Sequence, residues 1–126
     1  IYSNSGNLKW QDTPAPLQMF HGDADKNVPY GKVKILKYGL FGSQYIGSKF
    51  DKHGFPYYMY VEENVGHSLA GSPMADQREE IMSFLDKYVL DRKQLTTNTV
   101  VTDKTVTKVK KKRFGIKTYI NSNFGE

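Results

Sequence analysis

The sequence predicts an α/β fold in which parallel strands alternate with helices. Two short apolar runs, residues 17–21 and 57–61, have the length and composition of buried strands. Residues 43–53, between them, carry apolar side chains at helical spacing, and a second helical pattern follows the later run. A strand, a crossover helix and a second strand form a unit with parallel strands. Residues 17–90 are therefore expected to run strand, helix, strand, helix.

The first strand is bounded by residues that disfavour regular structure. Prolines at positions 14 and 16 forbid a helix before it, and Gly22 ends the apolar run. A loop rich in Asp, Asn and Pro follows directly. Residues 30–41 leave two alternatives open, because their apolar positions fit either a helical turn or an irregular crossing broken by glycines.

The crossover helix is expected at residues 43–53. Ile46 and Phe50 fit one apolar face, and basic side chains occupy the last turns, where positive charge favours a helix end. His53 is interpreted as one of these charge-compensating residues. Gly54 is expected to end the helix in the left-handed conformation.

The second strand and the last helix follow in order. Residues 57–61 are all aromatic, β-branched or methionine, which is typical of a strand. Ser72 and Pro73 indicate a helix start. Apolar residues then repeat at steps of three and four between positions 81 and 89, with charged residues between them, so one face of this helix is expected to pack.

The net charge of +5 is concentrated at the end of the chain. Residues 1–90 carry 9 basic and 10 acidic side chains, whereas residues 91–126 carry 9 basic and 3 acidic ones. The sequence therefore divides into a nearly neutral segment, residues 1–90, and a basic C-terminal extension, residues 91–126.

The basic extension contains two strand-like runs. Residues 105–113 combine β-branched types with lysines and an arginine, and residues 114–120 form a second such run. Positive charge of this kind attracts phosphate, but the pattern also fits a solvated edge strand whose lysines discourage pairing. No nucleic-acid-binding motif surrounds the run, so the edge-strand interpretation is preferred and nucleic acid is not an expected partner.

Asp25 and His67 are the candidate site residues. Asp25 lies four residues beyond the first predicted strand, and His67 lies in the loop after the second. The carboxyl ends of parallel strands open at the same edge of a sheet, where α/β proteins place their ligands. A carboxylate beside an imidazole fixes its tautomer and stabilises the imidazolium formed when it accepts a proton. The order of elements therefore predicts an acid and base pair.

Each of these residues also has a simpler interpretation. Asp25, before Asn-Val-Pro, fits a turn-capping aspartate, and His67, between glycine and serine, fits an exposed loop residue. Their combination on a crossover unit favours the pair. Asp23 is interpreted as shaping the loop, and His21 as packing against it or orienting it.

Several classes of site are excluded by composition and spacing. The chain has no cysteine, so disulfides, thiolate metal sites and cysteine nucleophiles are absent. The acidic loop departs from a calcium loop, because Val28 stands where glycine is needed and Lys34 where glutamate is needed. No second histidine lies at zinc-ligand spacing. We therefore expect no metal and no cofactor. No apolar run reaches 18 residues, so no membrane span is predicted.

The run His21-Gly-x-x-Asp25-x-x-Val28-Pro29, followed by Gly66-His67 after an aromatic strand, resembles the C-terminal part of an α/β-hydrolase. The nearest members are bacterial esterases and lipases, and prolyl-oligopeptidase-type peptidases are more distant. The resemblance covers about residues 12–90. It implies that Asp25 is the acid and His67 the base of a catalytic triad.

The nucleophile of that family is not found in this sequence. It is a serine in a Gly-x-Ser-x-Gly turn that precedes the acid, as do the oxyanion donors. Ser68, in Gly66-His67-Ser68-Leu-Ala70, partly imitates the turn, but no histidine follows it as the family order requires. The chain is thus expected to be the rear portion of an enzyme, inactive alone.

The expected function is that of a serine carboxylic-ester hydrolase acting through an acyl-enzyme on a small-molecule ester. Two alternatives stay open: a prolyl-oligopeptidase-like serine peptidase, and a non-catalytic interaction fragment. A two-stranded unit cannot cover its own faces and edges. The expected macromolecular partner is therefore the missing N-terminal half of the same fold or a second copy of the chain. The sequence leaves the compartment undecided.

Overall fold

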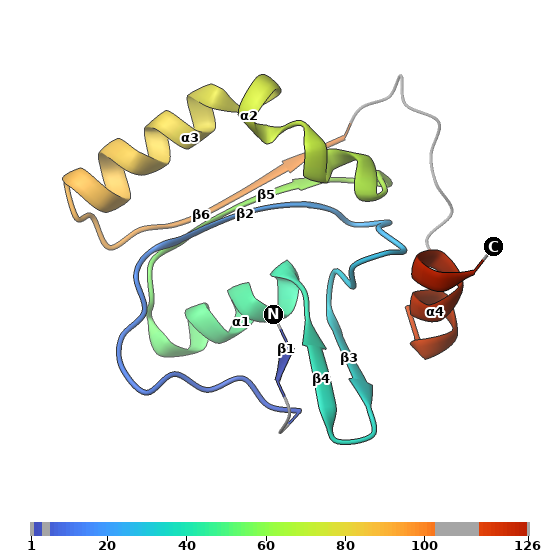
Figure 1. Ribbon diagram of the computed structural model, residues 1–126. Helices are drawn as coiled ribbons and strands as arrows, with labels where there is room; N and C mark the ends of the chain where they lie inside the picture. Colours follow the sequence, from blue (N-terminus) through green and yellow to red (C-terminus); the bar gives the residue numbers. More distant parts are fainter. Residues whose placement is uncertain (1, 4–5, 103–113, 126) are drawn as a thin grey trace.

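A computed structural model describes residues 2–3, 6–102 and 114–125. Its centre is a parallel sheet of three strands in the order β2-β5-β6, formed by β2 (Leu17–Gly22), β5 (Tyr57–Glu62) and β6 (Thr96–Val101). Figure 1 shows α1 on one face of this sheet and α2 and α3 on the other. The expectation of an α/β fold with parallel strands is confirmed.

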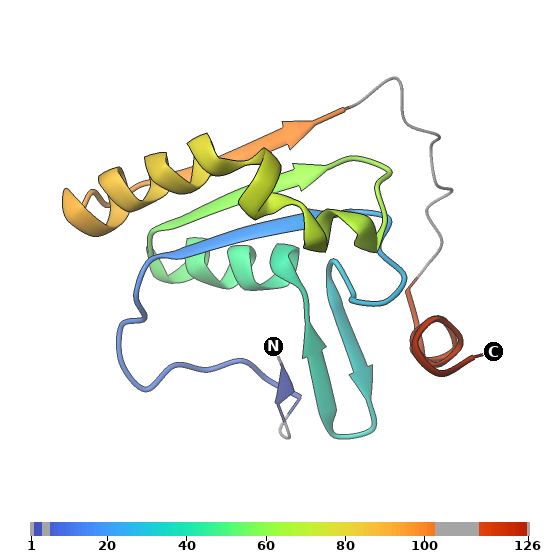
Figure 2. The same ribbon diagram turned by 45° about the horizontal axis from the view of Figure 1, so that its top comes forward.

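The three strands run in register from end to end. Leu17 pairs with Tyr57 and Gly22 with Glu62 across β2 and β5, and β5 pairs with β6 over its whole length. Figure 2 shows all three arrows pointing the same way. The loops that follow β2 and β5 therefore leave the sheet at the same edge.

Strand β6 lies beyond the expected boundary at residue 90. Its side chains alternate between exposed and half-buried, as in a strand with one covered face. The sheet therefore continues into the segment expected to be a separate extension.

Residues 30–41, for which two alternatives stood open, contain a β-hairpin. The strands β3 (Lys32–Ile35) and β4 (Tyr38–Phe41) pair in antiparallel fashion, and β1 (Tyr2–Ser3) adds to the other side of β4. Leu36 lies in the tight connection with φ of 54°, an uncommon conformation for a residue other than glycine. Both alternatives, the helical turn and the irregular crossing, are wrong, because most of the segment is paired strand.

Helix α1 (Ser43–His53) covers one face of the parallel sheet, as expected. Gly54 caps it in the left-handed conformation, with φ of 69°, and its N–H donates to the carbonyl groups of Phe50 and Asp51. The core beneath the helix is made of five buried side chains: Met19, Phe41, Ile46, Phe50 and Tyr57.

The other face of the sheet is covered by several short helical segments where one helix was expected. They are a 3₁₀ turn at His67–Gly71, α2 (Pro73–Asp76), α3 (Arg78–Phe84) and a wider π turn at Leu85–Leu90. Buried Gln77 interrupts the run between α2 and α3 with φ of −115° and ψ of 36°. A second core cluster lies here: Tyr58, Tyr60, Phe84 and Tyr88.

The expectation of a strand-like run at residues 114–120 is wrong, because α4 spans Ile116–Phe124. Ile116, Tyr119 and Ile120 are spaced at three and four positions, which suits a helix as well as a strand. Asn123 donates its side-chain N–H to the carbonyl of Asn27 at 3.0 Å, which ties α4 to the loop after β2. The strand expected at residues 105–113 lies outside the described residues. No described helix is both long and apolar enough to cross a membrane.

Candidate active site

The loops that follow β2 and β5 are joined to each other at the carboxyl edge of the sheet. The Asp23 N–H donates to the Glu62 carbonyl at 3.1 Å, and the Ala24 N–H donates to the Val65 carbonyl at 3.0 Å. The Asp23 carboxylate also accepts the N–H of Asn64 at 2.6 Å. The interpretation of Asp23 as a residue that shapes the loop is confirmed.

Gly22 permits the close approach of these loops. A Cβ atom at this position would lie 2.3 Å from the Val65 carbonyl oxygen and 2.5 Å from that of Gly66. Real Cβ atoms do not approach backbone oxygens so closely, so a side chain here would push the second loop away. Because His67 follows Gly66 directly, Gly22 sets the separation between the two candidate residues.

The buried Asp25 uses its two carboxylate oxygens differently. Its Oδ1 accepts the backbone N–H groups of Asn27 at 2.7 Å and Val28 at 2.9 Å. Its Oδ2 accepts the Nδ1–H of His67 at 2.8 Å. The turn-capping interpretation of Asp25 thus describes its Oδ1, while its Oδ2 makes the contact with His67. The two amide donors hold the carboxylate plane in place while it contacts the imidazole.

His67 presents its second ring nitrogen unbonded. The residue starts the 3₁₀ turn after β5, and its side chain is 46% exposed. With Nδ1–H donated to Asp25, the neutral ring carries its lone pair on Nε2. Within the described part of the chain, Nε2 forms no hydrogen bond with the protein. The arrangement is chemically that of a base oriented by a carboxylate.

A second histidine faces the same carboxylate from the interior. The buried His21 has its Nδ1 2.8 Å from the Ser43 Oγ, at the start of α1, and its Nε2 3.9 Å from the Asp25 Oδ2. This Nε2 is buried without a hydrogen-bond partner among the described residues. The ring also lies edge-on to Tyr30 in the loop, at 5.3 Å between centroids, consistent with a residue that orients the loop.

Burial lowers the pKa of His21 below its ordinary value of 6.5, and the nearby Asp25 carboxylate opposes this shift without reversing it. A neutral ring that accepts the Ser43 hydroxyl proton at Nδ1 carries its own hydrogen on Nε2, which lies 3.9 Å from the Asp25 Oδ2. The carboxylate then lies between two imidazoles, His67 outside and His21 inside.

The lowered pKa of His21 predicts a pH-dependent stability. The unfolded chain binds a proton at His21 more readily than the folded chain does. The contribution of His21 to the free energy of unfolding is therefore complete above about pH 6.5 and is lost as the pH falls toward the lower folded-state pKa. We expect the free energy of unfolding to fall as the pH is lowered from roughly pH 7 to pH 5. The slope of this free energy against pH should be smaller in His21→Gln. Urea unfolding across this range measures it, and equal slopes in the two proteins would contradict it.

Sequence reasoning did not find Ser43 as a member of this cluster. It treated the residue only as the start of a helix, because the contact with His21 depends on how α1 packs against β2. The only local signal is that Ser43 begins the helix that connects the two site-bearing strands. The residue is buried, with 8% exposure, and therefore supports the site from within.

Beside the pair lies a shallow cavity of about 110 Å³, which is small for a substrate. The residues that line this cavity are Phe20, His21, Gly22, Asp25, Val28, Gly66, His67 and Ala70. In the described part of the chain, no three His, Asp or Glu side chains are grouped so as to hold a metal ion. Asp25 and His67 therefore both line a cavity that is too small by itself to enclose a substrate.

In comparisons with known proteins, the chain matches no family model, no curated protein and no solved structure. Function is therefore inferred from the residues themselves, above all from the contact between Asp25 and His67, 42 positions apart in the sequence.

Proposed function

We propose that this chain supplies the acid and the base of a serine carboxylic-ester hydrolase of the α/β-hydrolase type. The single observation that carries the proposal is the 2.8 Å contact between Asp25 Oδ2 and His67 Nδ1 at the carboxyl edge of a parallel sheet. The nucleophilic serine and the oxyanion donors are proposed to come from a segment outside this sequence.

In the proposed reaction, each proton passes through the Nε2 of His67. The serine Oγ attacks the ester carbonyl while Nε2 accepts its proton, and the imidazolium then returns this proton to the leaving alcohol as the acyl-enzyme forms. A water molecule repeats the transfer, releasing the acid and restoring the serine. Asp25 stabilises the imidazolium in both steps, while two backbone N–H groups hold its other oxygen in place.

The two serines near the pair do not fit the role of nucleophile. Ser43 is buried and its hydroxyl contacts His21. Ser68 is exposed and adjacent to His67 in the chain, but the two side chains share no hydrogen bond in the described structure. A base and a nucleophile need such a contact, directly or through one water molecule.

An incomplete sheet supports the proposal that another segment joins this one. In the described chain, β2 pairs with β5 alone among the strands, so its other edge has no strand partner. His67 is also more exposed to solvent than is expected of a catalytic base, which works in a site from which water is excluded. The proposed partner is the N-terminal half of the same fold, and a second copy of this chain is the alternative.

The decisive experiment uses the natural gene product that contains these residues. We expect the coding sequence before Ile1 to encode a Gly-x-Ser-x-Gly turn after an apolar strand, within roughly 100 residues. A fluorophosphonate probe should label that serine, and p-nitrophenyl acetate should be hydrolysed. The 126-residue chain alone should show neither reaction.

Two outcomes would contradict this proposal. Hydrolysis by the isolated chain that Ser68→Ala abolishes would make Ser68 the nucleophile. A kcat/KM for short peptides above that for matched esters, in the complete protein, would instead favour the peptidase.

A further inference from the structure

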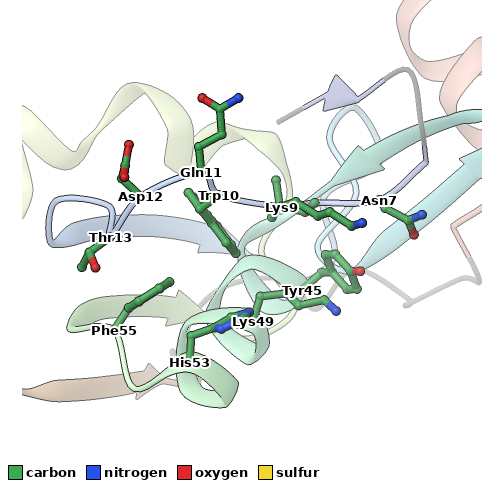
Figure 3. A pocket seen from close by; sticks show the side chains of 11 residues that line it. Asn7, Lys9, Trp10, Gln11, Asp12, Thr13, Tyr45, Lys49, His53 and Phe55 are labelled. Atoms are coloured by element: carbon green, nitrogen blue, oxygen red, sulfur yellow. The ribbon is translucent and has the colours of Figure 1, made fainter.

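A cavity of about 730 Å³ lies on the opposite side of α1 from the core, well within the size range of small-molecule sites. It opens between α1 and the segment that precedes β2, and Figure 3 shows the side chains around it. The residues that matter to the argument are Lys9, Trp10, Tyr45, Lys49, His53 and Phe55.

One end of this cavity is built from fixed aromatic rings. Trp10 packs edge-on against Phe50 at 5.2 Å, Phe55 at 5.9 Å and His53 at 6.1 Å between ring centroids. His53 in turn stacks on Phe55 at 5.2 Å with 14° between the ring planes. Rings that hold one another in this way present a preformed surface for a flat ligand.

The other end is cationic. Tyr45, Lys49 and His53 are four positions apart on α1 and so share one face of the helix. The Lys49 ammonium lies 5.4 Å from the centre of the Tyr45 ring. In the view of Figure 3, the Lys9 and Lys49 ammonium groups lie near the Tyr45 hydroxyl, while the Trp10 ring lies toward the opposite end.

The two lysines have no ion-pair partner within 4.0 Å among the described carboxylates. Asp12 also lines the cavity, but its carboxylate points away from both ammonium groups in Figure 3. The lining therefore pairs an apolar aromatic end with an unneutralised positive end.

We propose that this cavity binds a small aromatic carboxylate. The flat ring of such a ligand would lie against Trp10, His53 and Phe55, and its carboxylate would pair with Lys9 and Lys49. An aromatic ligand without a carboxylate would leave the two ammonium groups unpaired. A carboxylate without an aromatic ring would leave the aromatic end of the cavity unfilled. Binding consequently requires both parts.

This site is separate from the Asp25 and His67 pair. The two cavities share no lining residue, and the helix between them bears Ser43 at one end and His53 at the other. Ligand binding here is thus measurable whether or not the chain takes part in ester hydrolysis.

The chain contains its own reporter, because Trp10 is the one tryptophan in the sequence. Benzoate is the probe, titrated against the full chain with Trp10 fluorescence and the indole ¹H–¹⁵N resonance as readouts. We expect saturable changes with a Kd on the order of 1 mM, as suits so small a ligand. Benzamide and acetate, each lacking one part, should bind at least about fivefold more weakly.

Charge-neutral variants test the proposed cationic end. Lys9→Gln combined with Lys49→Gln should weaken benzoate binding about tenfold or more. Lys52→Gln, on the same helix but outside the cavity, should bind as the wild type does. Circular dichroism confirms that each variant is folded.

The inference is overturned by any of four results. Three of them are the absence of saturable benzoate binding up to about 10 mM, equal affinity for benzoate and benzamide, and unchanged affinity in the double variant. An equal loss of affinity in Lys52→Gln would show a general effect of charge and would also overturn it.

Discussion

Asp25→Asn is expected to lower the kcat for ester hydrolysis about 10⁴-fold in the complete hydrolase that we propose. The asparagine Oδ1 can still accept the N–H groups of Asn27 and Val28, so the loop keeps its shape. The new amide then directs its N–H at His67 Nδ1, which must accept it. The His67 proton moves to Nε2, and the ring can no longer take a proton from serine there.

Steady-state kinetics with p-nitrophenyl acetate measure this effect. Asp86→Asn is the matched control, because Asp86 is exposed on the π turn and distant in sequence from the pair. We expect its kcat to stay within about twofold of the wild-type value, as for surface substitutions. A loss of less than about tenfold in Asp25→Asn would contradict the assignment of Asp25 as the triad acid.

Gly22→Ala is expected to destabilise the fold by about 1–3 kcal/mol, as overpacking in a close-packed region does. The added methyl group would lie 2.3 Å from the Val65 carbonyl oxygen, which accepts the Ala24 N–H. Relief requires the second loop to move, carrying His67 away from Asp25. Catalysis in the complete enzyme should therefore fall together with stability.

Gly66→Ala provides a control in the same region. A Cβ atom on Gly66 would meet no other atom within 4 Å, and its φ of −88° suits alanine. Urea unfolding of the chain compares the two variants, and the nuclear Overhauser effects between the Asp25 and His67 loops report their separation. Equal stability in the two variants would show that the close approach at Gly22 is not what restrains the loops.

Much of the parallel unit was predictable because its signals are local. The strand at β2 is bounded by prolines and a glycine, α1 ends at Gly54, and β5 is dense in aromatic residues. The juxtaposition of Asp25 and His67 followed from topology alone, since crossover connections leave strand ends at one edge. The expectation needed no knowledge of how side chains pack.

The elements that were missed lack such local signals. The hairpin β3–β4 turns at Leu36 and Lys37. Because neither residue is a glycine or an asparagine, the sequence does not carry the usual signal of a hairpin turn. Strand β6 reads Thr-Thr-Asn-Thr-Val-Val and is mostly polar because one of its faces is exposed. Its place in the sheet is decided by pairing with β5, a tertiary contact.

The interior part of the site was equally hidden. Ser43 and His21 are 22 positions apart and meet only because α1 packs over β2. A lone buried histidine at a strand end gives no indication of its partner, and the nitrogen that faces Asp25 is visible only in three dimensions.

The in-register parallel sheet has a consequence for how this chain folds. Leu17 pairs with Tyr57, and Tyr57 with Thr96, so no strand of the sheet meets its neighbour through a short turn. The long segments between the paired strands must close into loops before the strand hydrogen bonds can form. This topology therefore folds slowly for a chain of its length. The hairpin β3–β4, by contrast, closes locally and is free to form early. The contact between Asp25 and His67 therefore depends on the long-range docking of β5 on β2 and cannot form from local structure alone.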